Sequence, residues 1–236
     1  SAVFKAERSN TVIPPGKEWD GKLQSLPFPH TGVGYLSSYL KKHGMETCAL
    51  DCSLDFQNLK DNLRKALETH KPDLIGVTVY TTVSSYAAGI VADIKSLTSV
   101  PIVAGGPHIS VAGKEFLERT GIKFGIMRDG ERPLLKLMVA LKAGGGDEDL
   151  RQIPGLIFKN QAGEYVAREN MDMVHDLDEL PFPDFSLYDV EKYRSWRDRR
   201  YELITSRGCP YACTYCGAPL VTGRKHRARS AKNVVD

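Results

Sequence analysis

Leu74-Ile-Gly-Val-Thr-Val-Tyr80 and Val100-Pro-Ile-Val-Ala-Gly-Gly-Pro-His108 are two apolar runs, separated by a segment, 84–97, with helical periodicity. A continuous run rich in β-branched residues is typical of a strand buried on both faces of a parallel sheet. The second run repeats this pattern and ends in a Gly-rich turn. The two runs therefore predict parallel strands joined by a helix.

The same alternation of strand and helix extends outward in both directions, over residues 3–143. Apolar residues recur with helical spacing at Val33, Leu36 and Leu40, and Gly44 follows as a natural stop. Strands are predicted at 3–6, 47–50, 74–80, 100–108 with its turn, and 123–127, and helices at 32–43, 56–70, 84–97, 114–119 and 133–142. Five alternations with right-handed crossovers predict an α/β fold with a flavodoxin-like, doubly wound parallel sheet.

The composition changes where Gly144-Gly-Gly146 is followed by Asp147-Glu-Asp149, which predicts a domain edge. After this edge, the sequence predicts a β-hairpin at 152–158 and 164–168 and an extended Pro-rich connector at 176–193. It then predicts a strand at 201–206 and the start of a helix at 230–236. The predicted domains are 1–146, 147–200 and 201–236. The third is expected to be only the first part of a barrel, so the chain taken alone is expected to be inactive although its first domain folds.

The 236 residues are 42% hydrophobic and 26% charged, with a formal net charge of +3, which is ordinary for a globular protein. No apolar run approaches the roughly 20 residues of a membrane-spanning helix, and the first residues lack the apolar core of a signal peptide. The five cysteines show no disulfide pattern, which favours a reducing, cytoplasmic location. The net charge is too small to indicate nucleic acid by itself.

Three cysteines dominate the end of the chain. Cys209, Cys213 and Cys216 lie in Ser206-Arg-Gly-Cys-Pro-Tyr-Ala-Cys-Thr-Tyr-Cys-Gly-Ala-Pro219 with the spacing C-x3-C-x2-C. An odd number of thiols in so tight a loop cannot form paired disulfides. Soft sulfur ligands favour zinc, copper(I) or an iron–sulfur cluster, and tetrahedral zinc would require a fourth ligand that no nearby Cys or His supplies. Three cysteines on a cubane cluster would leave one iron open to a substrate or cofactor.

This loop resembles the signature of the radical S-adenosylmethionine family, in which C-x3-C-x2-C carries an aromatic residue before the last cysteine, here Tyr215. The resemblance implies a [4Fe-4S] cluster on the three cysteines, with S-adenosylmethionine on the open iron and contacts to it from Tyr215 and Gly217. An electron from the cluster would then cleave S-adenosylmethionine to a 5′-deoxyadenosyl radical. A zinc knuckle is the alternative interpretation of the same thiols.

Small, polar and Gly-rich residues follow the predicted strands, at the edge where open parallel sheets bind their ligands. The four loops are 51–53, 80–82, 105–108 and 128–131. Such residues let backbone approach a bulky ligand and leave amides free to donate. For Gly105-Gly-Pro107 a simple turn is the alternative interpretation.

The order of Thr31-Gly-Val-Gly-Tyr-Leu36, Gly105-Gly-Pro-His108, Asp129-Gly-Glu131 and Leu177-Asp-Glu-Leu-Pro-Phe-Pro183 resembles the cobalamin-binding domain that precedes the cluster domain in cobalamin-dependent radical enzymes. The resemblance covers nearly all of the chain and implies a corrin over the carboxyl ends of the strands. The cobalamin contacts that it implies are Asp51, Ser53, Thr78, Tyr80, Thr81, Thr82, Gly105, Gly106, Pro107, His108, Asp129, Gly130 and Glu131.

Two departures from the family pattern affect the expected site. The Asp-x-His-x-x-Gly motif that supplies a lower axial histidine in classical corrinoid domains is absent, since Asp51 is followed by Ser53 at the histidine position. Cobalamin is therefore expected without a histidine ligand from the protein, its lower face turned toward Thr81, Thr82 or water. Met127-Arg-Asp-Gly-Glu131 also replaces the Gly-Glu-Gly-Glu-like turn that is common after the fifth strand.

Several other side chains admit two interpretations. His108 lies in a ligand-facing turn, although a hydrogen-bonded loop residue is the more ordinary role. Cys48 and Cys52 repeat the x3 spacing, but at a strand end they fit small core residues better than ligands. Two basic runs could contact RNA, although a solvated or domain-interface surface is the simpler use. These runs are Arg194, Arg197, Arg199 and Arg200 beside Trp196, and Arg224-Lys-His-Arg227 with Arg229.

Together the resemblances imply a cobalamin-dependent radical S-adenosylmethionine enzyme, either a methyltransferase acting on an unactivated carbon or an anaerobic cyclase or rearrangement enzyme. The expected partners are a small-molecule substrate and an electron donor such as flavodoxin or ferredoxin, without membrane or nucleic acid. Two alternatives are a radical enzyme that modifies RNA and a non-catalytic corrinoid-binding module. The sequence assigns no catalytic side chain.

Overall fold

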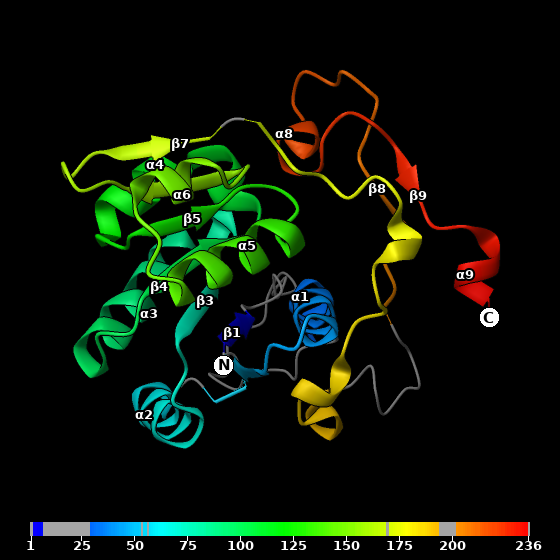
Figure 1. The fold of residues 1–236 in the computed structure, drawn as a ribbon. Helices are drawn as coiled ribbons and strands as arrows, with labels where there is room; N and C mark the ends of the chain where they lie inside the picture. Colours follow the sequence, from blue (N-terminus) through cyan, green and yellow to red (C-terminus); the bar gives the residue numbers. More distant parts are fainter. Residues whose placement is uncertain are drawn as a thin grey trace, which may run out of the picture.

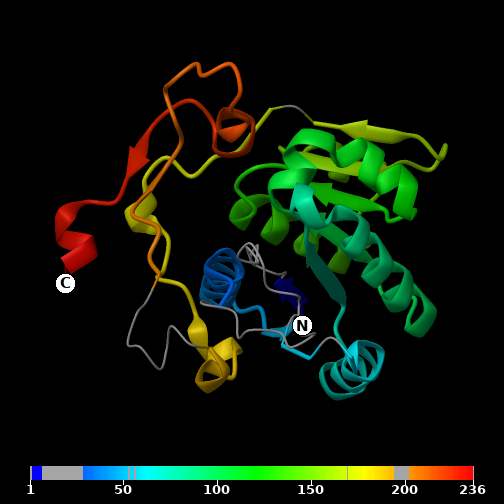
Figure 2. The same ribbon diagram turned by 180° about the vertical axis from the view of Figure 1, so that it is seen from behind.

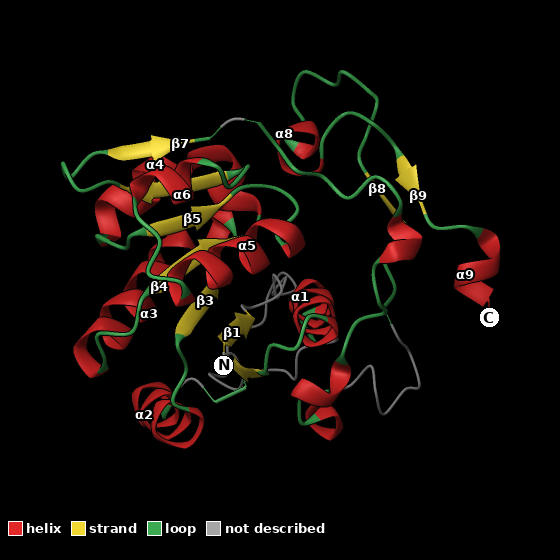
Figure 3. Ribbon diagram, viewed as in Figure 1, coloured by secondary structure: helices red, strands yellow, loops and turns green. Residues whose placement is uncertain are grey.

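The computed structural model describes residues 2–6, 29–52, 54, 55, 57–168, 170–193 and 202–235. Its centre is one sheet with the strand order β2-β1-β3-β4-β5-β6-β7 (Figures 1 and 3). The strands are β1 (Ala2–Ala6), β2 (Thr47–Asp51), β3 (Leu74–Thr78), β4 (Ile102–Gly105), β5 (Phe124–Ile126), β6 (Leu156–Lys159) and β7 (Tyr165–Ala167). The first five are parallel, and their order confirms the predicted flavodoxin-like, doubly wound sheet.

Helices cover both faces of this sheet, as the two opposite views show (Figures 1 and 2). They are α1 (Thr31–Lys42), α2 (Leu59–His70), α3 (Ser84–Leu97), α4 (Pro107–Thr120), α5 (Glu131–Lys142) and α6 (Asp147–Arg151). One core cluster joins α1, α5 and α6 to the sheet through residues such as Val33, Leu137 and Phe124. The other joins α2, α3 and α4 to the opposite face through residues such as Ile90 and Val77. Both faces of the sheet are thus buried, which explains why the strand sequences are continuous apolar runs.

The predicted hairpin is present as β6 and β7, and it belongs to the same sheet. β6 pairs antiparallel with β5, with Gly125 opposite Ile157, and β7 pairs antiparallel with β6. Leu156 and Phe158 of β6 are buried in the core cluster of α1 and α5. The Gly144–Gly146 stretch, predicted as a domain edge, is thus followed by chain that completes this sheet.

Helix α4 is longer than predicted. The sequence predicts a helix at 114–119, whereas α4 begins at Pro107. Pro107 occupies a first-turn position, where its missing N–H costs nothing and its fixed φ suits a helix. The backbone at Ala112 departs from helical angles and kinks the helix. A further helical segment that begins at Pro107 therefore precedes the predicted helix and is separated from it by the kink at Ala112.

Beyond the sheet, the connector crosses the end of the fold. It contains the 3₁₀ turns η2 (Leu177–Glu179), η3 (Phe185–Leu187) and η4 (Val190–Lys192). The elements of residues 202–235, here called the C-terminal segment, are β8 (Ser206–Arg207), α8 (Ala218–Thr222), β9 (Arg227–Ala228) and α9 (Ala231–Val235). The strand predicted at 201–206 was placed too early, because of the described residues 202–207 only Ser206 and Arg207 form strand pairs, with Ala228 and Arg227. Ser230 caps α9 by accepting from the Asn233 N–H, as predicted.

Within the described residues, no helix combines the length and apolarity that crossing a membrane would require.

Candidate functional site

A cavity of about 500 Å³ opens at the carboxyl ends of β3, β4 and β5. Its floor is made of small residues, among them Gly76, Thr78, Ala104 and Gly105. The start of α1 forms one wall, and the loop from Arg128 to Glu131 forms another. The C-terminal segment covers it with residues of 204–208 and 221–222. The cavity therefore lies where open parallel sheets bind ligands, between the sheet and the segment that carries the three cysteines.

Two adjacent glycines shape the floor differently. A Cβ on Gly105 would meet no atom nearer than the Ile126 carbonyl oxygen at 4.0 Å, so Gly105 leaves open space in the cavity. Gly106 has φ 98° and ψ −178°, a conformation that is essentially restricted to glycine. A Cβ there would lie 2.9 Å from the Val79 carbonyl oxygen. Gly106 is thus required by the backbone, whereas Gly105 can serve the ligand.

His30 is a cavity residue that the sequence interpretation missed. Its Nδ1 accepts a hydrogen bond from the Val33 N–H at 3.1 Å and caps helix α1. Its Nε2 lies 2.9 Å from the Tyr80 hydroxyl. Since Nδ1 is an acceptor, the proton of the neutral imidazole is on Nε2 and is donated to Tyr80. Both ring nitrogens of His30 are therefore engaged within the protein.

Burial lowers the pKa of His30, against an opposing effect of its backbone hydrogen bond and of the charges on Asp51 and Glu202. The neutral ring is therefore the favoured form near pH 7. A signal for this residue existed in the sequence, because His30 directly precedes a predicted helix. Histidine is a less usual N-cap than Ser, Thr, Asp or Asn, so the sequence pattern did not predict His30 as the cap.

The structure brings together eight of the predicted cobalamin contacts. Those that line the cavity are Thr78, Tyr80, Gly105, Gly106, Pro107, Asp129, Gly130 and Glu131. Thr81, Thr82 and His108 do not line it; His108 Nδ1 lies 3.3 Å from the Thr81 hydroxyl instead. Burial and the charge of Arg119 lower the pKa of His108. Ser53 lies outside the described residues.

Asp51 is another predicted contact that does not line the cavity. Its carboxylate accepts a hydrogen bond of 2.7 Å from the Tyr193 hydroxyl of the connector. Burial, and then the charge of Asp51, raise the pKa of Tyr193, which keeps the hydroxyl protonated as a donor. The connector therefore covers the end of β2, whereas the cavity lies at the ends of β3, β4 and β5.

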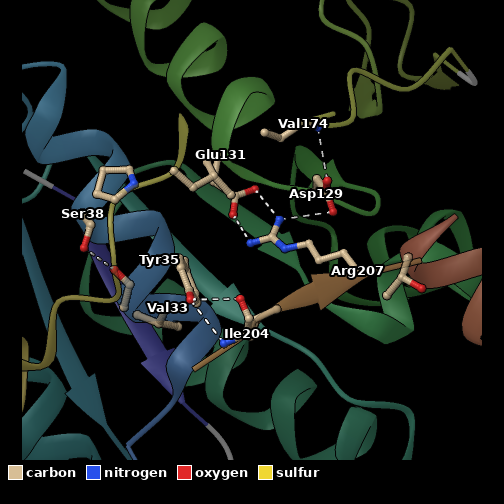
Figure 4. Close-up of polar contacts among 12 residues, drawn as sticks. Val33, Tyr35, Ser38, Asp129, Glu131, Val174, Ile204 and Arg207 are labelled. Carbon is tan, nitrogen blue, oxygen red and sulfur yellow. Dashed lines mark hydrogen bonds and ion pairs between the residues drawn. The ribbon is translucent and has the colours of Figure 1, made fainter. Parts of the chain in front are cut away.

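Asp129 and Glu131 line the cavity, but their carboxylates bind arginines of the C-terminal segment. Arg207 donates to both oxygens of Glu131, at 2.6 and 3.2 Å, and lies 3.3 Å from Asp129. Arg227 pairs with the other oxygen of Asp129. Figure 4 shows Arg207 between the two acidic side chains. We call these four residues the carboxylate–arginine network. Ion pairs within the protein account for the two acidic side chains after β5, without a ligand.

The second basic run therefore does not form one exposed surface. Arg227 and Arg229 are only 3% and 6% exposed. Arg229 donates to the Leu180 carbonyl oxygen and stacks over the rings of Tyr35 and Phe182. These two arginines serve an internal interface, which was the simpler of the predicted uses. Arg194, Trp196, Arg197, Arg199 and Arg200 of the first run lie outside the described residues.

Arg128 was not identified as a site residue from the sequence. It has a positive φ of 61°, and its N–H donates to the Ser110 hydroxyl at 2.8 Å. Its Nε donates to the Leu220 carbonyl oxygen of α8 at 3.1 Å. Arg128 thus places the helix that follows the cysteines beside the cavity.

The cysteine loop is accessible. Cys209 is half-buried, and Cys213 and Cys216 are exposed. The Cys209 N–H donates to the Gly223 carbonyl oxygen, and Gly208 approaches Lys225 so closely that a Cβ would collide with its carbonyl. The Ala218 N–H donates to Cys216 Sγ at 3.5 Å, as an amide does toward a thiolate ligand.

No three His, Cys, Asp or Glu side chains of the described residues are grouped tightly enough to hold a metal ion, so the structure does not draw the three thiols together. The donor set still fits a cluster in its chemistry, with soft sulfur donors that are accessible and one amide donating to sulfur. Tyr215 is 91% exposed, and Gly217 precedes α8. Cys48 is partly buried, and burial raises the pKa of its thiol, while Cys52 is in the core. Both fit the core role predicted for them.

Comparisons with known proteins agree with this geometry. Residues 26–138 match the family described as the B12 binding domain. The chain is 27% identical over 228 residues to an uncharacterized methyltransferase of Pyrococcus horikoshii, covering 95% of this chain and 48% of that protein. It is 28% identical over 213 residues to the anaerobic magnesium-protoporphyrin IX monomethyl ester cyclase of Rubrivivax gelatinosus, covering 89% of this chain and 38% of that protein.

Among solved structures, the fold matches the radical S-adenosylmethionine methyltransferase TsrM of Kitasatospora setae, determined with cobalamin and a [4Fe-4S] cluster bound. The TM-score is 0.73 at 23% identity, and the match covers 100% of this chain and 45% of that one. The chain thus spans about half or less of each of these proteins.

The fold and the cavity define the class of the first part of the chain, which is a B12-binding domain of the doubly wound type. Together with the cysteine loop and the relatives, they show that the chain is similar to cobalamin-binding radical S-adenosylmethionine proteins.

Proposed function

We propose that the chain is the cofactor-binding part of an enzyme that holds cobalamin in the cavity and a [4Fe-4S] cluster on Cys209, Cys213 and Cys216. One observation carries the proposal: the segment with the three cysteines covers a cavity at the carboxyl ends of β3, β4 and β5. This arrangement would place the two cofactors next to each other. The proposed reaction is methyl transfer to an unactivated carbon or a cyclase or rearrangement reaction.

When bound, the cluster would supply the electron for reductive cleavage of S-adenosylmethionine, and cobalamin would supply a carrier for a methyl group. The protein's own contribution is placement and exclusion of water. Gly105 leaves room for close approach of the ligand, and His30 fixes the Tyr80 hydroxyl at the cavity wall. The C-terminal segment closes the opposite side.

The proposed substrate is a small molecule, in keeping with the relatives, one of which is named for its action on magnesium-protoporphyrin IX monomethyl ester. An electron donor such as flavodoxin or ferredoxin is the proposed source of electrons. The RNA-modifying alternative loses support, because Arg227 and Arg229 of the described basic run are buried against protein groups. We also propose that residues 1–146 are the cobalamin-binding domain, that 147–200 are a hairpin, which extends the same sheet, and a Pro-rich linker, and that 201–236 begin the cluster domain.

The experiment is anaerobic reconstitution of the chain with iron, sulfide and hydroxocobalamin, followed by gel filtration and measurement of iron, sulfide and cobalt per chain. We expect all three elements to remain with the protein. Changing Cys209, Cys213 or Cys216 singly to Ala should remove most of the iron and sulfide, because the site has no spare donor. The matched controls Cys48→Ala and Cys52→Ala should keep both. Equal loss of iron from a control would show that the ligand set is wrong, and a chain without cobalt would contradict the cobalamin site.

A further inference from the structure

We propose that Asp129 and Glu131 are positioning residues, which hold the cluster-bearing loop over the cavity through Arg207 and Arg227 and thereby slow the escape of cobalamin. The inference rests on the proposed function and deepens it. It also differs from the sequence expectation, in which Asp129 and Glu131 contact cobalamin directly.

The carboxylates and the arginines of the network meet in a defined geometry. Arg207 binds Glu131 with both of its Nη atoms, at 3.2 and 2.6 Å, which is the bidentate arrangement that fixes orientation as well as distance. The Nη1 atom also lies 3.3 Å from Asp129 Oδ1. Arg227 donates to the other oxygen, Asp129 Oδ2, and to the Val174 carbonyl oxygen. Asp129 additionally accepts from the Val174 N–H. Each carboxylate is thus committed to arginines or backbone.

The side chains of the network are buried. The side chains of Arg207 and Glu131 are 11% and 3% exposed, and those of Arg227 and Asp129 are 1% and 6% exposed. Burial of the Arg207 guanidinium acts to lower its pKa, but the charges and hydrogen bonds of Glu131 and Asp129 outweigh burial and raise it. Removing one partner of such a pair leaves an uncompensated buried charge, which is strongly unfavourable. The C-terminal segment therefore docks well only when both carboxylates are present.

The network holds both ends of the cysteine loop. Arg207 and Arg227 lie opposite each other in the β8–β9 pair, so the loop between them, which carries all three cysteines, is held at both of its ends. Arg207 and Gly208 also line the cavity, and Cys209 follows directly. A displacement of Arg207 would therefore open the cavity and move the first cysteine at the same time. The network joins the cobalamin site to the cluster loop through one ion-paired strand.

The test compares the full chain with Glu131→Gln and Asp129→Asn, which remove a charge without changing shape. Asp61→Asn is the matched control, because it changes a carboxylate in the exposed Arg64–Asp61 pair of α2, away from the cavity. Hydrogen exchange of the protein without cofactors should become about tenfold or more faster at 204–208 and 227–230 in the two variants. Exchange in β3 and β4 should be unchanged, and the control should match the wild type.

The second readout is release of hydroxocobalamin from loaded protein into a large excess of apo-acceptor. Release should become about tenfold or more faster for Glu131→Gln and Asp129→Asn, equivalent to a loss of about 1.4 kcal/mol. Glu131→Asp, which keeps the charge, should lie between these variants and the wild type. Arg207→Lys keeps a positive charge but loses the bidentate geometry. Arg207→Lys should therefore release hydroxocobalamin as fast as Glu131→Gln does. If Glu131→Gln does not fold, Arg207→Lys provides the test in its place.

Unchanged exchange and unchanged release in folded Glu131→Gln or Arg207→Lys would overturn the inference. Faster release with unchanged exchange would also overturn it, since that result assigns the carboxylates to direct contact with cobalamin. A wild-type chain that binds no hydroxocobalamin would contradict the proposed function instead, while the exchange measurement would still test the network.

Discussion

His30 connects a helix start to the cavity through its two ring nitrogens, each of which has a defined partner. This role depends on the neutral ring, because a protonated Nδ1 could not accept from the Val33 N–H. The fold therefore stabilises the neutral form, and the lowered pKa of His30 expresses that preference.

We predict a pH dependence from this residue. The pKa of His30 in the folded protein lies below the ordinary histidine value of 6.5, so the unfolded chain binds more protons between the two values. The contribution of His30 to the free energy of unfolding is thus fully present above about pH 6.5 and is lost as pH falls through the lowered folded value. Asn is also a good N-cap, so His30→Asn should keep the cap and flatten the stability curve in this window. Urea unfolding between pH 5 and about 8 tests this, and parallel curves for both proteins would contradict it.

Gly106 and Gly105 provide a second prediction at this scale. Gly106→Ala should lower the free energy of unfolding by about 2 kcal/mol, because its conformation is essentially restricted to glycine and a Cβ would approach the Val79 carbonyl. Gly105→Ala, the neighbouring control, should remain within about 1 kcal/mol of wild type. Thermal and chemical unfolding measure both. Equal destabilisation by the two changes would show that the backbone at Gly106 is not what requires glycine.

The sequence identified the residues of the acidic turn after β5 but not their partners. Asp129-Gly-Glu131 was predicted to contact the ligand because polar residues at a strand end indicate a ligand site. Its carboxylates instead bind Arg207 and Arg227. A contact between residues so distant in sequence leaves no local signal. Arg227 lies in a basic run, and Arg207 lies beside the cysteine motif.

At the scale of elements, periodicity predicted α1, α3 and the parallel strands well, because apolar spacing decides them. Helix α4 was predicted too short. It begins at Pro107, directly after two glycines, and this combination of residues is typical of a turn. The brief β8–β9 pair has no periodicity of its own, because it consists of two residues in each strand. Such elements exist through tertiary contacts rather than through local pattern.

The connector supplies the prediction at this scale. Tyr193 is fully buried and donates to the charged Asp51 carboxylate at 2.7 Å. Tyr193→Phe should therefore lower the free energy of unfolding by about 2 kcal/mol, as expected for a hydrogen bond to a charged group. Tyr188 donates at 3.2 Å to the neutral His30 carbonyl, so Tyr188→Phe should cost only about 1 kcal/mol. Chemical denaturation compares them, and a larger effect at Tyr188 would contradict this ranking.

At the scale of the whole molecule, the alternation of strand and helix was sufficient to predict the doubly wound sheet and the edge at which the cavity opens. It was not sufficient to show which part of that edge is open. The connector covers the end of β2 through Tyr193, and the C-terminal segment covers the ends of β3 to β5 while leaving the cavity. Both coverings come from chain beyond the five-stranded unit, so only the structure reveals them.

The central claim is that cobalamin binds in this cavity, and an equilibrium titration of the chain with hydroxocobalamin tests it most directly. Gly105→Leu would place a side chain in the cavity, and Gly89→Leu on α3, where a Cβ also meets open space, is the matched control. We predict one site per chain in the wild type and in Gly89→Leu, and an affinity about tenfold or more weaker in folded Gly105→Leu. Equal affinity in all three proteins, or no binding by the wild type, would contradict the account.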